Sequence, residues 1–165
     1  MSVSLTWADE ADQGTEVKDV KLWIFNADDG SLVEEKHYGS AQEVSSQRFV
    51  LPEGSYRILA ATNLTEPFTV GEQTRALTNW NNIQIGLTNP KDVKDNAYFG
   101  VADVRIDNKE GNYVVQNPVK SVLAELTIII ENVPKGTEMS GKALDAAWCL
   151  FPTQKNGDGD YGLPS

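Results

Sequence analysis

Side chains that could carry out acid–base or nucleophilic chemistry are scarce in this sequence. His37 is the only histidine and Cys149 the only cysteine among 165 residues. A hydrolytic triad needs a nucleophile, a base and an orienting acid, and His37 stands in a polar, charged stretch that indicates an exposed strand. Cys149 lies in the apolar run 146–151, where a thiol is more often a small buried side chain than a nucleophile. The sequence therefore predicts a protein that is not an enzyme.

Metal and cofactor chemistry is equally poorly supported. Zinc needs several histidine or cysteine ligands, and the chain has two such residues. The sequence contains no glycine-rich phosphate-binding motif and no HExxH motif. Segment 156–162 places Asn156, Asp158 and Asp160 at alternate positions, as a calcium loop does, but Tyr161 takes the place of the glycine such loops require. We expect no cofactor and no metal, and an acidic tail in this segment.

The charge balance narrows the range of partners. The formal net charge is −10, from 24 acidic and 14 basic residues. No cluster of lysine and arginine forms a stripe that could neutralise phosphates, so nucleic acid is not an expected partner. No stretch approaches the ~20 apolar residues that span a bilayer.

The four tryptophans offer a different chemistry, because an indole ring can stack on a sugar ring. They occupy positions 7, 23, 80 and 148. Trp80 stands in the polar stretch 71–90 and is the candidate residue for glycan stacking. Aromatic side chains on strands are more often part of a core, and glycan binding is therefore the alternative hypothesis.

Alternation of apolar and polar residues is the strongest pattern in the chain and predicts β strands. Turn residues at 26–30 and 52–54 join two pairs of these strands into hairpins. Segment 122–131 has the clearest alternation, and no segment of ordinary helix length shows a 3.6-residue period. The predicted strands are 3–7, 19–25, 31–38, 46–51, 55–62, 82–86, 97–106, 113–115, 122–131 and 143–151.

Many short strands separated by glycine, proline and asparagine turns indicate an all-β protein. The predicted fold is an antiparallel β-sandwich of seven or more strands with transthyretin-like, Greek-key topology. One such domain accounts for residues 1–152. Residues 153–165 are rich in glycine and aspartate and are predicted to begin a linker to a further domain.

An ordered set of features resembles the fimbrillin-type fimbrial subunits of Bacteroides-like bacteria, in particular the N-terminal domain of anchor and accessory subunits. An opening strand at 3–7 is followed by strand 20–26, which leads into the Asp29-Gly30 turn. Segment 49–63 then carries the order leucine, proline, any residue, glycine, any residue, tyrosine at 51–56. Further on, 98–100 and 122–133 fall where the family places comparable elements.

The resemblance implies a non-catalytic role in cell adhesion, in fimbriae on the cell surface. Family members are secreted lipoproteins, which implies an extracytoplasmic location and a lipid anchor in the outer membrane. It also implies assembly with other fimbrial subunits by strand exchange, with Val3, Leu5 and Trp7 as the candidate edge strand. No arginine precedes Arg48, so we expect an anchor or accessory subunit that keeps its first strand. The alternative is a surface lipoprotein module that binds a host or glycan ligand through Trp80.

Overall fold

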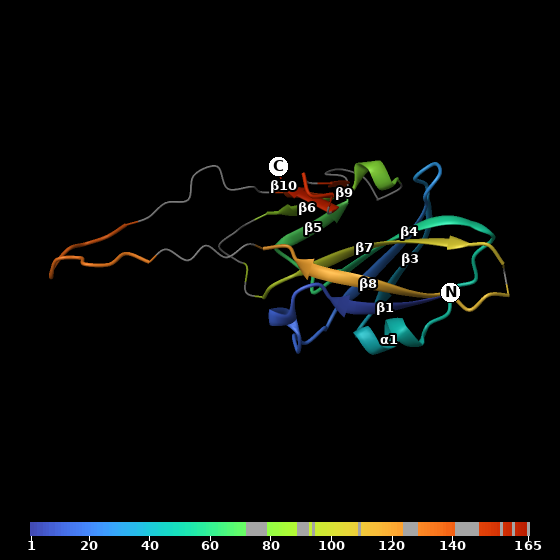
Figure 1. Cartoon of the computed structure of the whole chain (residues 1–165), viewed down its shortest axis with the longest axis horizontal. Helices are drawn as coiled ribbons and strands as arrows, with labels where there is room; N and C mark the ends of the chain where they lie inside the picture. The colour runs from blue at the N-terminus through green and yellow to red at the C-terminus, as the bar shows by residue number, and fades with distance from the viewer. Residues whose placement is uncertain are drawn as a thin grey trace.

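A computed structural model describes residues 1–71, 79–88, 93, 95–108, 110–123, 129–140, 149–155, 157–159 and 161–164. Two β-sheets pack against each other, one with the strand order β1-β8-β7-β4-β2-β3 and one with the order β10-β9-β6-β5 (Figure 1). The strands are β1 (Ser2–Trp7), β2 (Val20–Asn26), β3 (Leu32–Tyr38), β4 (Gly54–Thr62), β5 (Phe68–Gly71), β6 (Gln84–Leu87), β7 (Tyr98–Ile106), β8 (Val114–Ser121), β9 (Cys149–Lys155) and β10 (Tyr161–Pro164). The helical elements are α1 (Ala41–Ser46) and the 3-10 turns η1 (Glu10–Asp12) and η2 (Trp80–Asn82).

Both faces of the six-stranded sheet are buried around its central strands. In β2, Leu22 and Ile24 point to one face, whereas Trp23 and Phe25 point to the other. The second face packs on Ile85 of β6 and its neighbours in the four-stranded sheet. The first face is covered by α1, by the segment 47–53 and by the loop that precedes β2. The predicted all-β sandwich is confirmed, and alternation in β2 is an alternation between two cores.

One predicted strand, 46–51, is wrong. Residues 41–46 form the short helix α1, and 47–53 form no regular element. Ser40 caps the helix, because its Oγ accepts a hydrogen bond from the Glu43 amide at 3.2 Å, and the Glu43 carboxylate accepts one from the Gly39 amide at 2.8 Å. This reciprocal capping favours a helical turn. The apolar side chain of Phe49 enters the core without belonging to a strand.

The larger sheet is not purely antiparallel. β1 pairs with β8 in parallel, from Ser2 opposite Val114 to Trp7 opposite Val119, whereas the other strand pairs are antiparallel. Parallel neighbours need a long connection instead of a hairpin. More than a hundred residues separate β1 from β8, and the order of the chain therefore permits this pairing.

The predicted strand 122–131 is also not observed where the structure describes it. Residues 129–131 belong to no strand, and Ile129 is 80% exposed. Ser121 ends β8, because its Oγ accepts from the Leu123 amide at 3.0 Å and donates to the Leu123 carbonyl at 2.7 Å. The remainder, 124–128, lies outside the described residues.

The C-terminal part of the chain adds strands to the smaller sheet. The predicted strand 82–86 corresponds to β6, and the described part of 143–151 belongs to β9, whose residues 149 and 150 pair with β6. β9 and β10 pair with each other, so strand structure continues past the predicted boundary at residue 152. In the described ranges, no helix has the length and hydrophobicity to cross a membrane.

Candidate interaction edge

β1 forms one free edge of the six-stranded sheet, and its pairing with β8 decides which backbone groups face outward (Figure 1). The Ser2 amide donates to the Tyr113 carbonyl at 2.8 Å, and the Ala8 amide donates to the Val119 carbonyl at 2.9 Å. Backbone groups of a strand alternate in direction with a period of two. The amides and carbonyls of residues 3, 5 and 7 therefore point away from β8.

The outward groups are unoccupied over most of the strand. At its start, the terminal amine of Met1 donates to the Phe49 carbonyl at 2.9 Å, and the Phe49 amide donates back to the Met1 carbonyl at 2.8 Å. Beyond this pair, no backbone hydrogen bond within the described part of the chain reaches the outward side of Val3, Leu5 or Trp7. These three residues present a short row of free donors and acceptors.

The side chains of the same three residues fix β1 to the body of the protein. Val3 is fully buried, and the half-buried Leu5 and Trp7 pack against the same core. The Trp7 ring meets the Tyr98 ring edge-on, with centroids 5.0 Å apart and planes inclined by 75°. The structure thus places the three predicted residues on one face of an edge strand, with anchored side chains and an open backbone.

A small pocket lies beside the end of β1. Its volume is about 230 Å³, and α1, β8 and the end of β4 contribute to its walls. The lining residues are Leu5, Thr6, Trp7, Thr15, Val17, Ala41, Thr62 and Val119. Sequence reasoning missed this pocket, because its walls come from five separate parts of the chain and no local pattern joins them.

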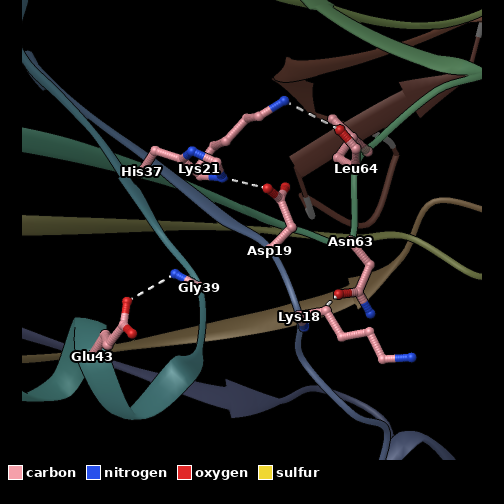
Figure 2. Close-up of polar contacts among 8 residues, drawn as sticks. All are labelled: Lys18, Asp19, Lys21, His37, Gly39, Glu43, Asn63 and Leu64. Carbon is pink, nitrogen blue, oxygen red and sulfur yellow. Dashed lines mark hydrogen bonds and ion pairs between the residues drawn. The ribbon is translucent and has the colours of Figure 1, made fainter.

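The opposite edge of the sheet, formed by β3, has a different character. It carries Glu34, Glu35, Lys36 and His37 in succession. Lys36 pairs with Glu34 at 3.1 Å, and His37 pairs with the Asp19 carboxylate (Figure 2). Charged side chains on an edge strand discourage the addition of another strand.

Two titrating groups near this edge have shifted pKa values. Burial raises the pKa of the Tyr38 phenol at the end of β3, and the hydroxyl stays uncharged there. In the turn between β2 and β3, hydrogen bonds from the Ser31 hydroxyl at 2.6 Å and the Ser31 amide at 2.8 Å lower the pKa of Asp29. Both groups belong to the β2–β3 hairpin, at the edge of the sheet opposite β1.

The other candidate residues do not assemble into a site. Trp80 is only 4% exposed and packs edge-on against Phe25, with Arg57 over its ring at 4.9 Å. An interior ring offers no open face to a sugar. Trp148 lies outside the described residues. Asp158 is in the turn between β9 and β10, and the described residues contain no group of three histidine, cysteine or acidic side chains suited to hold a metal.

A polar hollow at the end of β4 was not foreseen either. Asn63 has a left-handed backbone with φ of 55°. Its Oδ1 accepts from the Lys18 amide at 2.9 Å (Figure 2), and its Nδ2 donates to the Glu16 carbonyl at 2.9 Å. The hollow has a volume of about 490 Å³, and its lining includes Asp95 and Asn96. Asn63 thereby holds the N-terminal loop against the sheet.

Comparison with known proteins gives a family and several similar folds. The model of a family described as fimbrillin-A associated anchor proteins Mfa1 and Mfa2 matches residues 1–160. The fimbrial anchor protein Mfa2 from Porphyromonas gingivalis has a similar structure, with a TM-score of 0.53 and 15% identity over 72% of this chain and 49% of that one. Among curated proteins, no sequence matches significantly.

Two further solved structures share the fold. A proposed polysaccharide-binding protein from Bacteroides thetaiotaomicron VPI-5482 gives a TM-score of 0.55 at 14% identity, covering 72% of this chain and 46% of that one. A proposed adhesin from Bacteroides ovatus gives a TM-score of 0.53 at 18% identity, covering 72% and 45%. The chain therefore spans less than half the length of each of these three proteins.

Proposed function

Because the chain belongs to the family of fimbrillin-A associated anchor proteins Mfa1 and Mfa2, we propose that it is a non-catalytic structural and adhesive component of cell-surface fimbriae. Its role is that of an anchor or accessory subunit. It assembles by accepting a strand from a neighbouring fimbrial subunit along β1. A strand added to a sheet edge gains main-chain hydrogen bonds, and neighbouring side chains give specificity.

The observation that carries this proposal is the uncharged, open edge of β1. The outward backbone groups of Val3, Leu5 and Trp7 have no partner in the described part of the chain, and none of the residues from Ser2 to Trp7 is charged. The other edge of the same sheet, β3, carries charged side chains. An incoming strand therefore meets a lower electrostatic and desolvation cost at β1.

In this proposal β1 stays in place, and the added strand pairs with it. Removing β1 would expose the site of the fully buried Val3 and break the contact between the Trp7 and Tyr98 rings. No arginine lies between Met1 and Arg48, so an arginine-directed protease has no cleavage site within β1 or between β1 and Arg48. Both features support an anchor or accessory subunit over one whose first strand is released.

The proposal also covers the wider setting of the domain. We place the protein outside the cytoplasm, with a lipid anchor in the outer membrane, and with a second β-sandwich domain after this one. Support comes from the family match over residues 1–160 and from solved relatives of which the matched part makes up less than half. Glycan stacking on Trp80 is not proposed, because that ring is buried.

The test compares a charge on each edge. Ser4→Lys places a charge on the half-buried side of β1, and Val33→Lys adds the same charge to β3, where Val33 is already exposed. Binding is measured by surface plasmon resonance to the purified fimbrial subunit of the organism that encodes the chain. Ser4→Lys should weaken binding about tenfold or more, whereas Val33→Lys should leave it unchanged. If circular dichroism shows that both variants are folded and they bind equally well, β1 is not the acceptor edge.

A further inference from the structure

Residues 129–140 project away from the body of the protein. Figure 1 shows this segment in orange, where it doubles back at a tip that lies beyond the ends of both sheets. At the tip the Thr137 amide donates to the Pro134 carbonyl at 3.2 Å. Gly136 has a φ of 88°, as the third residue of a type II turn requires. We call residues 129–140 the projecting hairpin.

The projecting hairpin exposes apolar side chains of a kind that a fold ordinarily buries. Ile129 is 80% exposed, Ile130 58% and Met139 60%. A single exposed apolar residue is common on a protein surface and needs no explanation. Three within one short segment form an apolar surface, and such surfaces mark places where a protein meets a partner.

The backbone of the projecting hairpin is also largely without partners. Among the described residues, the bond between Thr137 and Pro134 is its one backbone hydrogen bond. Its first residues, 129–131, end the stretch 122–131 that has the clearest strand alternation in the sequence, yet they belong to no strand. An extended segment with free backbone groups and exposed apolar side chains has what is needed to add to the edge of a β-sheet.

A sheet in the same protein is the partner that fits these properties. A permanently exposed apolar hairpin would promote aggregation, so its cover should also be permanent. A domain on the same chain is always present at high effective concentration, whereas a separate subunit is not. The part of each solved relative that matches this chain is less than half of that relative.

We infer that the projecting hairpin docks on the second β-sandwich domain, where it pairs with an open strand edge and buries Met139 together with Ile129 or Ile130. Successive side chains of an extended segment point to opposite sides, so one of the two isoleucines faces the second domain. The inference rests on the second domain of the proposed function. It does not depend on strand addition at β1.

Oxidation of Met139 by hydrogen peroxide measures whether the hairpin is covered. A methionine thioether that is open to solvent is readily converted to the sulfoxide. The rate is followed by mass spectrometry of the Met139 peptide, in residues 1–165 alone and in the full protein that includes whatever follows Ser165. The full protein should oxidise at least about tenfold more slowly at Met139, because the reaction must wait for the contact to open. Equal rates would overturn the inference.

Three variants of the full protein locate the contact. Ile129→Asp and Ile130→Asp each place a charge on one side of the hairpin, and a buried charge without a partner is costly. At least one of them should restore the rate of Met139 oxidation to that of residues 1–165. Val50→Asp is the matched control, because Val50 is 94% exposed on the body of the protein, and it should leave the rate unchanged. If neither isoleucine variant raises the rate, the inference is wrong.

The remaining outcomes separate this inference from the proposed function. If Met139 oxidation slows as the concentration of residues 1–165 rises, a second copy covers the hairpin and the inference is overturned. If no folded domain follows residue 165, the proposed second domain fails and the inference fails with it. If such a domain follows and Met139 is still oxidised rapidly, the inference alone fails. Ser4→Lys, which tests strand addition at β1, should not change the rate of Met139 oxidation.

Discussion

The two edges of the six-stranded sheet, β1 and β3, differ in which side chains and backbone groups they expose. In β1 the side chains of Val3, Leu5 and Trp7 point into the core, and the backbone groups of these residues have no partner in the described part of the chain. β3 exposes charged side chains along its length, with His37 65% exposed. Sheet edges that face water are commonly protected by charge. The lack of this protection at β1 is the basis of our proposal that another strand is added there.

The edges also differ in how firmly they are joined to the sheet. β3 pairs with β2 along its whole length, whereas β8, which carries β1, pairs with β7 only at Tyr98–Ser121 and Phe99–Lys120. The ladder stops near Pro118, which has no amide to donate. There the buried Asn117 reaches past β7 and donates from Nδ2 to the Ile58 carbonyl at 3.2 Å.

Of the substitutions that test this comparison, Gly100→Ala should have the largest effect on the stability of the protein. A Cβ at this position would lie 2.2 Å from Asn117 Oδ1 and 2.4 Å from the Pro118 carbonyl oxygen. The Pro118 oxygen belongs to the backbone of β8, so it cannot move aside as the end of a flexible side chain can. Gly100→Ala should lower the free energy of unfolding by about 3 kcal/mol, as overpacking of a core does. Urea denaturation measures the change. Gly157→Ala, in open space between β9 and β10, is the matched control, and it should change stability by less than about 0.5 kcal/mol.

A smaller effect is expected from the helix that packs beside β1. Ser40→Ala removes the cap of α1, in which the Ser40 hydroxyl accepts from the Glu43 amide. Loss of such a cap costs about 1 kcal/mol, and thermal denaturation should show a lower midpoint. Gln42→Ala changes an exposed side chain of the same helix and serves as the control. Equal midpoints for Ser40→Ala and wild type would show that α1 does not depend on this cap.

The smallest effect concerns the turn that leads to β3. The pKa of Asp29 is lowered from its usual value of 3.8, chiefly by the hydrogen bond from the Ser31 hydroxyl. A lowered pKa means that the carboxylate contributes stability above pH 3.8, and that this contribution is lost as pH falls through the lowered pKa. In Ser31→Ala, an NMR titration should find the Asp29 pKa closer to its usual value. An unaltered titration would assign the shift to the backbone bond alone.

Much of the fold could be predicted from local patterns. The patterns of 19–25, 55–62 and 97–106 correctly indicated strands, although β2, β4 and β7 bury consecutive residues, because successive side chains point into two different cores. α1 escaped prediction because only Val44 of its six residues is buried, which is too little for an apolar stripe. Trp80 stands among polar residues in the sequence, yet it fills the space beside Phe25.

The candidate site could be predicted only in part. Spacing alone shows that Val3, Leu5 and Trp7 share one face of a strand. Which backbone groups they leave open depends on parallel pairing with β8, more than a hundred residues away. The pocket around Thr62 depends likewise on contacts between distant segments. Nothing in a local pattern specifies such contacts.

Hydrogen exchange of individual amides tests strand addition at β1 most directly. Exchange is followed by NMR on the labelled chain, alone and bound to the fimbrial subunit. Binding should slow the exchange of the Val3, Leu5 and Trp7 amides, which have no partner among the residues that the structure describes, and leave the amides of β3 unchanged. Protection that appears on β3, or that spares these three amides while the subunit is bound, would contradict the account.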